Sequence, residues 1–180
     1  MAGTGDSKSK FSKFCTILIP YWLQQKENLK YKIIYFALEE SEEEFIDSIF
    51  LMLLKTRYDI SIDYASLNSY RAIDQKTLDL MDKCADEVNK ILEHVTIIDN
   101  LFNPTGLYYA CMDKAKQWGK INDDGTYTPT DPNLQVVVVC DHISLITGEK
   151  DKDSGTYLSK GQAMAKWSTH YCLKYITKRL

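Results

Sequence analysis

The segment from Gln135 to Ile146 reads QVVVVCDHISLI, and it decides the fold class of this chain. Four consecutive valines and a cysteine lead directly into Asp141, which His142 follows. An unbroken β-branched run does not alternate between core and solvent. It therefore predicts a strand buried on both faces, in the middle of a parallel sheet covered by helices. A carboxylate at the carboxyl end of such a strand lies where open α/β sheets bind ligands. The alternative is that Asp141 only begins a turn.

The overall composition bounds the class of protein. The 180 residues are enough for one domain with a hydrophobic core, and 44% hydrophobic with 26% charged residues is an ordinary globular composition. The net charge of -3 argues against a general polyanion binder but leaves a local basic groove open. Widely spaced cysteines without metal-ligand spacing favour a reducing compartment. The apolar run 14–23 lacks a cleavage site and no run could span a bilayer, so we expect a cytoplasmic protein.

The first nine residues, MAGTGDSKS, partly match the phosphate-binding pattern G-x-x-x-x-G-K-[ST]. Lys8 and Ser9 fit the pattern, whereas Ala2 and Ser7 stand where it has glycine. Such a loop needs backbone N–H groups directed at phosphate oxygens, a lysine for the outer phosphates, a hydroxyl for Mg²⁺ and a helix behind them. Ser7 is the more serious departure, because that position often needs a conformation that only glycine adopts cheaply. A flexible terminus of small residues is the alternative.

A second strand is predicted from Tyr31 to Leu38, YKIIYFAL, and it runs into Glu39. Ser41 and Glu44 form a capping box that begins the next helix. Glu39 therefore ends a buried strand, as Asp141 does, and the two carboxylates become a candidate pair. An ordinary solvent-exposed charge at a strand end is the alternative for Glu39.

Strands and helices alternate along the rest of the chain, which is the pattern of a covered parallel sheet. The predicted ranges are a helix at 10–25 that Pro20 kinks or shortens, a strand at 95–99, and helices at 74–93, 104–118 and 162–180. One stripe of the 74–93 helix is predicted to be buried, formed by Leu78, Met81, Ala85, Val88 and Leu92. Asp124 and Gly125 suggest a small hairpin or an exposed excursion. The charged segment 147–161 is predicted to be a mobile loop.

Three motifs, in order, resemble the RecA-like ATPase domain of DnaB-type hexameric replicative helicases. They are the phosphate-loop-like start, Leu38-Glu39-Glu40-Ser41 and Asp141-His142-Ile143-Ser144. The resemblance is closest to the helicase half of phage primase-helicases, where L-E-E-S and D-H-I-S occupy these places. It implies an α/β fold of the RecA-like P-loop NTPase kind, with a mainly parallel sheet and helices on both faces. It also implies ATP and Mg²⁺ as cofactors, single-stranded DNA as partner and a homo-hexamer in a bacterial or phage-infected cell.

The resemblance further implies a role for each matching residue. The residues that would wrap the nucleotide phosphates are Gly3, Thr4, Gly5, Asp6, Ser7, Lys8, Ser9 and Lys10. Lys8 would contact the β- and γ-phosphates, while Ser9 and Asp141 would hold Mg²⁺. Glu39 would polarise the attacking water as general base. His142 would sense the nucleotide state, with a structural role as the alternative.

The segment 147–161 carries Lys150, Lys152 and Lys160, which by the resemblance would track the phosphates of single-stranded DNA. A plain solvated loop is the alternative. Members of the family have a strand before the phosphate loop. After the helix that corresponds to the last one predicted here, they continue with a further strand and an arginine finger. We therefore expect residues 1–180 to be a partial RecA-like domain without the first and last core strands, weak or inactive alone. A recombinase or clock-type ATPase, and a non-catalytic interaction protein on a degenerate nucleotide-binding fold, are the alternative functions.

Overall fold

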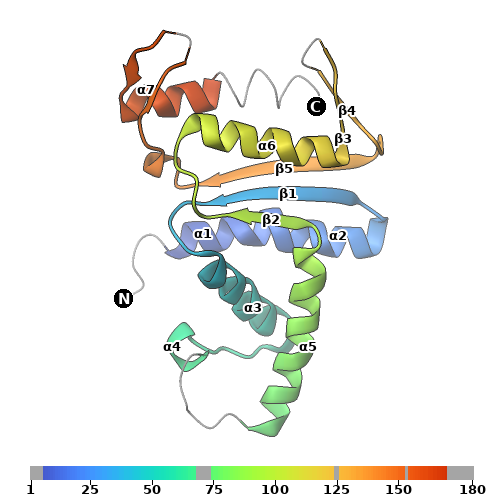
Figure 1. The fold of residues 1–180 in the computed structure, drawn as a ribbon. Helices are drawn as coiled ribbons and strands as arrows, with labels where there is room; N and C mark the ends of the chain where they lie inside the picture. The colour runs from blue at the N-terminus through green and yellow to red at the C-terminus, as the bar shows by residue number, and fades with distance from the viewer. Residues whose placement is uncertain (1–5, 68–73, 124–125, 153, 170–180) are drawn as a thin grey trace.

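A parallel sheet of three strands organises the computed structural model, which describes residues 6–67, 74–123, 126–152 and 154–169. The strands are β1 (Lys30–Ala37), β2 (Val95–Ile98) and β5 (Leu134–Asp141), in the order β2-β1-β5. Both outer strands run parallel to β1. The chain is therefore an α/β protein, as the alternation of strands and helices predicted (Figure 1).

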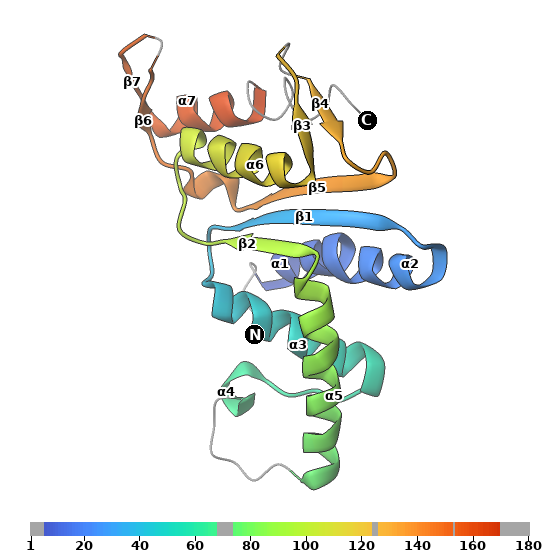
Figure 2. The ribbon, with the colours of Figure 1, turned by 45° about the vertical axis from the view of Figure 1, so that its right-hand side comes forward.

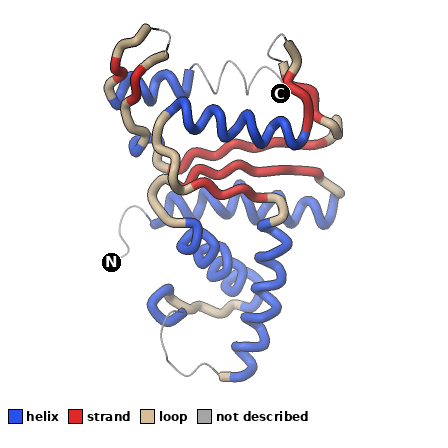
Figure 3. The backbone as a smooth tube through the Cα atoms, in the orientation of Figure 1, coloured by secondary structure: helices blue, strands red, loops and turns tan. Residues whose placement is uncertain are grey.

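Helices cover both faces of this sheet (Figure 3). One face carries α1 (Asp6–Lys13), the π-helical turn η1 (Phe14–Leu18), α2 (Ile19–Glu27), α3 (Glu42–Tyr58) and α5 (Gln75–Leu92). The other carries α6 (Pro104–Trp118) and α7 (Lys160–Ala165). Helices α3 and α5 project away from the sheet together with the short α4 (Tyr64–Leu67), as Figure 2 shows.

The central strand β1 separates two hydrophobic clusters, because alternate side chains of a strand point to opposite faces. Ile33 and Tyr35 belong to the cluster between the sheet and helices α1 to α5. Ile34 and Phe36 belong to the cluster between the sheet and helices α6 and α7. All four side chains are at most 1% exposed. The strand that is buried on both faces is therefore β1.

The four-valine strand β5 is not central in the described sheet, so that prediction was wrong. It lies at the edge of the sheet, and Val137 is 36% exposed. A β-branched run indicates that both faces of a strand are suited to packing, but it says nothing about which strands lie beside it. The central place belongs to β1, whose sequence mixes β-branched with aromatic residues.

The first helical segment runs over residues 6–27 and is not shortened at Pro20. Instead, a π-helical turn precedes the proline, and Pro20 lies in the first turn of α2. The π-helical turn already interrupts the regular i→i−4 hydrogen bonds just before Pro20, so a residue without an N–H is accommodated there. The buried residues of this segment include Ile17, Leu18 and Tyr21. Asn28 ends α2 at φ 52°, a left-handed cap that turns the chain into β1.

Both predicted helix caps are confirmed. The Ser41 hydroxyl accepts a hydrogen bond from the backbone N–H of Glu44, and the Glu44 carboxylate accepts one from the backbone N–H of Ser41. The Asp74 carboxylate accepts from the backbone N–H of Thr77 at the start of α5. Local sequence therefore sets where α3 and α5 begin.

The buried stripe of α5 differs from the predicted one. Cys84 is fully buried, whereas Ala85 is exposed and Leu78 is 38% exposed. Val88 is buried and Met81 is partly buried, as predicted. Residues 84 and 85 both lie on the side of Met81, so the rotation of α5 against α3 decides which of them is covered.

Two short hairpins lie near α6. Strands β3 (Gly119–Ile121) and β4 (Tyr127–Pro129) confirm the predicted hairpin, whose turn residues 124–125 lie outside the described residues. Strands β6 (Glu149–Lys150) and β7 (Tyr157–Leu158) form an antiparallel pair inside the segment 147–161, which was predicted to be a loop. Trp167 is buried, and residues 170–180 of the last predicted helix lie outside the described part. No described helix is both long and apolar enough to cross a membrane.

Candidate functional site

The carboxyl ends of β1 and β5 meet at one edge of the sheet. Ala37 and Asp141, the last residues of these strands, lie opposite each other in the parallel register. Two loops leave the sheet from this edge, one containing Glu39 and the other beginning at His142. The first turn of α1 lies at the same edge (Figure 1). Open parallel sheets bind their ligands at this edge.

The two loops contact each other through Glu39 and His142. His142 Nε2 lies 3.2 Å from a carboxylate oxygen of Glu39, and both side chains are partly exposed. His142 has φ 60° and ψ 58°, the left-handed conformation, and it precedes the 3-10 turn η2 (Ile143–Leu145). Residues other than glycine adopt this conformation rarely, and histidine does so more readily than most. The turn brings the imidazole to the glutamate of the neighbouring loop.

Glu40, the neighbour of Glu39, is held by a buried lysine. The Lys13 ammonium lies 2.6 Å from each carboxylate oxygen of Glu40 and donates to Ser48 Oγ at 2.6 Å. It also lies 4.6 Å from the centroid of the Phe45 ring. Lys13 is only 1% exposed, and a charge at such depth needs a partner. The pair ties the loop after β1 to α1 and α3.

This ion pair separates the roles of the two adjacent glutamates. Glu40 is occupied by Lys13, whereas Glu39 has no lysine or arginine partner among the described residues. Lys13 was not among the candidate residues predicted from the sequence, although a signal was present. Lys13 shares a helix face with Ile17 and Tyr21, both core residues, and a charge on such a face indicates a buried partner.

Asp141 is connected to α1 through a buried tyrosine. The Tyr35 hydroxyl lies 3.2 Å from Asp141 Oδ2 and 3.3 Å from Ser12 Oγ. Tyr35 is fully buried, and that burial, opposed by the Ser12 hydrogen bond and reinforced by the Asp141 charge, raises the pKa of its phenol. The phenol therefore stays protonated at neutral pH and can donate to the carboxylate.

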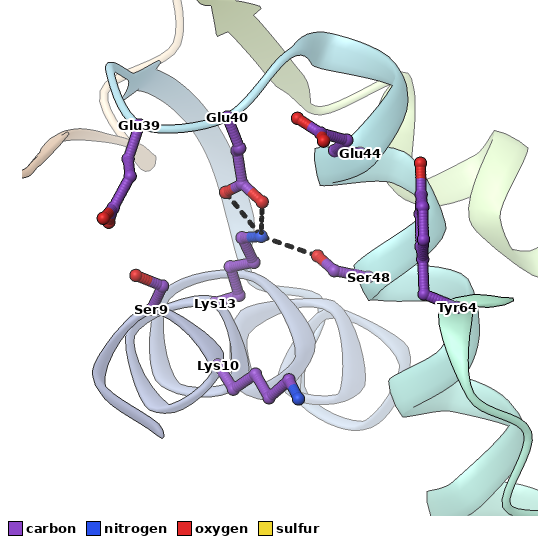
Figure 4. Close-up of a pocket in the computed structure, with 8 residues that line it drawn as sticks. All are labelled: Ser9, Lys10, Lys13, Glu39, Glu40, Glu44, Ser48 and Tyr64. Carbon is purple, nitrogen blue, oxygen red and sulfur yellow. Dashed lines mark hydrogen bonds and ion pairs between the residues drawn. The ribbon is translucent and has the colours of Figure 1, made fainter. Parts of the chain in front are cut away.

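A pocket of about 350 Å³ opens beside these groups (Figure 4). Its lining residues are Ser9, Lys10, Lys13, Glu39, Glu40, Glu44, Ser48 and Tyr64. The carboxylate of Glu39 and the hydroxyl of Ser9 point into the same space from opposite sides. The volume lies in the range of small-molecule sites in proteins.

The residues predicted to bind phosphate are only partly brought to this pocket. Ser9 and Lys10 line it, whereas Lys8 is exposed and does not. The predicted residues Gly3, Thr4 and Gly5 lie outside the described residues, and only the backbone of Asp6 and Ser7 is described, as the start of α1. Asp141 does not line the pocket, but its Tyr35 contact reaches Ser12, one helical turn beyond Ser9.

The lining contains more carboxylates than lysines, so an anion is favoured there only when a cation is bound with it. The pocket carries three glutamates and two lysines, and Lys13 is already paired. In the described part of the chain, no three His, Cys, Asp or Glu side chains are grouped so as to hold a metal by themselves. Mg²⁺ does not need such a group, because it binds through one or two carboxylates, substrate phosphates and waters. Oxygen ligands of the type that Ser9 and Asp141 offer fit this ion.

The segment 147–161 is anchored by a buried carboxylate, that of Glu149, which was not among the candidate residues predicted from the sequence. Glu149 accepts hydrogen bonds from Asn103 Nδ2 and from the backbone N–H and hydroxyl of Thr105, at 2.8 to 3.0 Å. Burial alone would raise the pKa of the Glu149 carboxyl, but these donors and Lys166 together lower it. The carboxylate sits at the N-terminus of α6, where negative charge is favoured. The predicted loop is thereby fixed to α6.

The candidate DNA-contacting lysines of this segment are exposed. Lys150 lies on β6, Lys152 in the turn and Lys160 at the start of α7. The Lys152 ammonium lies 5.2 Å from the centroid of the Tyr109 ring, which is itself exposed. Their positions are compatible with a solvated surface as well as with a nucleic-acid contact.

Comparison of the chain with known protein families, with curated proteins and with solved structures finds no match.

Proposed function

We propose that this domain binds a nucleoside triphosphate together with Mg²⁺ at the carboxyl edge of β1 and β5, and hydrolyses it. The observation that carries the proposal is the arrangement of Glu39 and Asp141. Asp141 ends β5 and Glu39 lies two residues after the end of the neighbouring parallel strand β1, beside the first turns of α1 and a pocket that contains Ser9. The two carboxylates have different surroundings and lie beside the start of a helix. Such an arrangement is suited to phosphoryl transfer, in which positioning and charge neutralisation supply most of the catalysis.

The proposed roles follow from the surroundings of each group. Ser9 and Asp141 would supply oxygen ligands to the metal, and the exposed Lys8 would reach the outer phosphates. When bound, Mg²⁺ supplies neutralisation of the phosphate charge. Lys10 lines the pocket and adds a second cation on the same side of it.

Glu39 is proposed as the general base that accepts a proton from the attacking water. Its neighbour Glu40 is unsuited to that role because both of its oxygens contact Lys13. With a proton on Nε2, His142 donates to Glu39 and holds the carboxylate at the mouth of the pocket. A ligand that displaces this contact would change the position of His142, which suits a residue that responds to the bound nucleotide.

We further propose that the hydrolysis drives a DNA helicase or translocase of the hexameric replicative kind. The support is the sequence L-E-E-S after β1 and D-H-I-S at the end of β5, at the two loops that meet at the site. Single-stranded DNA would be the partner and a homo-hexamer the working assembly. A RecA-like recombinase or clock-type ATPase would share the site and differ in what the hydrolysis moves.

The first test is binding of a fluorescent ATP analogue to the purified chain, with and without Mg²⁺. We expect binding that Mg²⁺ strengthens and that Asp141→Asn weakens. Absence of any Mg²⁺-dependent binding by the unchanged chain would refute the proposal and favour a non-catalytic interaction protein.

The second test compares Glu39→Gln with Glu40→Gln, a pair of identical changes in adjacent residues. Glu39→Gln should keep nucleotide binding and abolish turnover, whereas Glu40→Gln should lower stability through the loss of the Lys13 pair and retain turnover. Undiminished hydrolysis in Glu39→Gln would remove this residue from its assigned role. Unwinding of forked DNA then separates a helicase from a recombinase or clock-type ATPase.

A further inference from the structure

Tyr35 stands at the centre of the fold, yet its hydroxyl reaches the proposed site. The side chain is fully buried, with its ring 4.6 Å from that of Phe45 at an interplanar angle of 61°. Most of the ring therefore belongs to the core beneath α1 and α3. The hydroxyl meets two polar groups of the described chain, Asp141 Oδ2 at 3.2 Å and Ser12 Oγ at 3.3 Å.

The direction of these hydrogen bonds follows from the proton count. A phenol carries one proton, and an ionised carboxylate only accepts. The Tyr35 proton therefore goes to Asp141, and the Ser12 hydroxyl donates to the phenol oxygen. The chain Ser12–Tyr35–Asp141 runs from α1 across β1 to the end of β5. Because the phenol ring is locked by packing, the hydroxyl is a donor in a fixed place.

We propose that Tyr35 is a positioning residue for Asp141, which holds Oδ2 so that Oδ1 is presented to the Mg²⁺ of the bound nucleotide. This inference rests on the proposed function. A carboxylate held on one oxygen by a rigid donor loses less rotational freedom when its other oxygen binds a cation. The contact of Tyr35 with Ser12 also couples the metal ligand to α1, the helix that follows the proposed phosphate loop.

The same strand contains a matched control. Tyr31 lies four residues before Tyr35, on the same face of β1, and it is also buried. Its ring lies 4.9 Å from that of His94 at the opposite end of the strand, and its hydroxyl has no hydrogen-bond partner among the described residues. Tyr31→Phe and Tyr35→Phe therefore remove the same atom from the same layer of side chains. Only the second of these changes removes a hydrogen bond to Asp141.

The experiment measures metal binding in the full chain. Mn²⁺ replaces Mg²⁺, a non-hydrolysable ATP analogue is the nucleotide, and electron paramagnetic resonance reports the free Mn²⁺. Loss of a hydrogen bond to a charged group should weaken Mn²⁺ binding by about tenfold in Tyr35→Phe. Tyr31→Phe should bind Mn²⁺ as the unchanged chain does. Metal-free binding of the nucleotide should be the same in both variants, since Tyr35 acts only through the metal ligand.

Asp141→Asn supplies the second arm. In that background, Tyr35→Phe should have no further effect on the residual Mn²⁺ binding, because the residue that it positions is already changed. Circular dichroism and thermal unfolding verify that each variant is folded.

Three outcomes would overturn the inference. Equal Mn²⁺ affinity in Tyr35→Phe and Tyr31→Phe would show that the hydroxyl positions nothing. Equal losses of metal-free and metal-dependent nucleotide binding in Tyr35→Phe would indicate a general packing defect instead. If the unchanged chain binds no metal–nucleotide complex at all, the proposed function fails and this inference fails with it. Normal binding by the unchanged chain together with an unaffected Tyr35→Phe refutes the inference alone.

Discussion

Replacing Lys13 with methionine should destabilise the fold through the buried ion pair that anchors the loop after β1. Methionine retains most of the aliphatic stem but removes the ammonium, and with it the contacts to Glu40, Ser48 and the Phe45 ring. Removing one partner of a buried pair costs about 3–5 kcal/mol. The Glu40 side chain is 21% exposed and can regain some water, so we expect a loss of about 2–3 kcal/mol. Urea denaturation at pH 7, followed by circular dichroism, measures this free energy of unfolding.

The matched control is Lys55→Met, which removes a lysine that pairs with Asp59 on the surface. There the two side chains are 55% and 89% exposed, so solvent already screens the pair and little stability should be lost. The double variant Lys13→Met with Glu40→Gln should recover part of the loss, because glutamine needs no cation. A Lys13→Met loss no larger than that of Lys55→Met would refute the buried-pair argument. Simple additivity of the two single losses in the double variant would refute it as well.

Three further predictions concern pH, thiol reactivity and packing. Because the folded pKa of Glu149 is lowered from its ordinary value of 4.5, its contribution to stability is present above that pH and is lost as the pH falls through the folded value. Glu149→Gln should therefore make the melting temperature fall less steeply below about pH 4.5, and an unchanged slope would contradict the prediction. Burial raises the pKa of the Cys84 thiol to about 11. Iodoacetamide at pH 8 should therefore label the half-buried Cys15 before Cys84, as mass spectrometry of peptides would show. Early labelling of Cys84 would count against its burial. Trp167→Ala should cost about 3–5 kcal/mol in urea denaturation, because this buried ring fills the cluster below α6. The exposed Tyr157→Ala should cost far less, and equal losses would contradict the packing described.

The sequence predicted best where structure depends on near neighbours. The capping box at Ser41 and the cap at Asp74 join groups three residues apart, so a short pattern contains the whole interaction. The strand and helix ranges follow from periodicity in the same way. The pairing of Glu39 with Asp141 as candidate site residues also came from position, since both follow runs typical of buried strands.

The interactions that join distant parts of the chain were not predicted from the sequence. Lys13 and Glu40 are 27 residues apart, Thr105 and Glu149 are 44 apart, and Tyr35 and Asp141 are 106 apart. None of these pairs has a local pattern, because each depends on which helix covers which strand. For the same reason, the sequence does not distinguish the adjacent Glu39 and Glu40, although Glu40 forms an ion pair with Lys13 and Glu39 does not.

The linear order of residues was sufficient for the α/β class, the helix caps and the placing of acidic residues after two strands, because all of these arise from contacts within a few residues. Only the tertiary structure decided three other features. They are the strand order β2-β1-β5, the edge position of the valine strand, and the different surroundings of Glu39 and Glu40. They depend on the registry of strands and the rotation of helices, which minimise exposed apolar surface and unpaired charge over the whole chain at once.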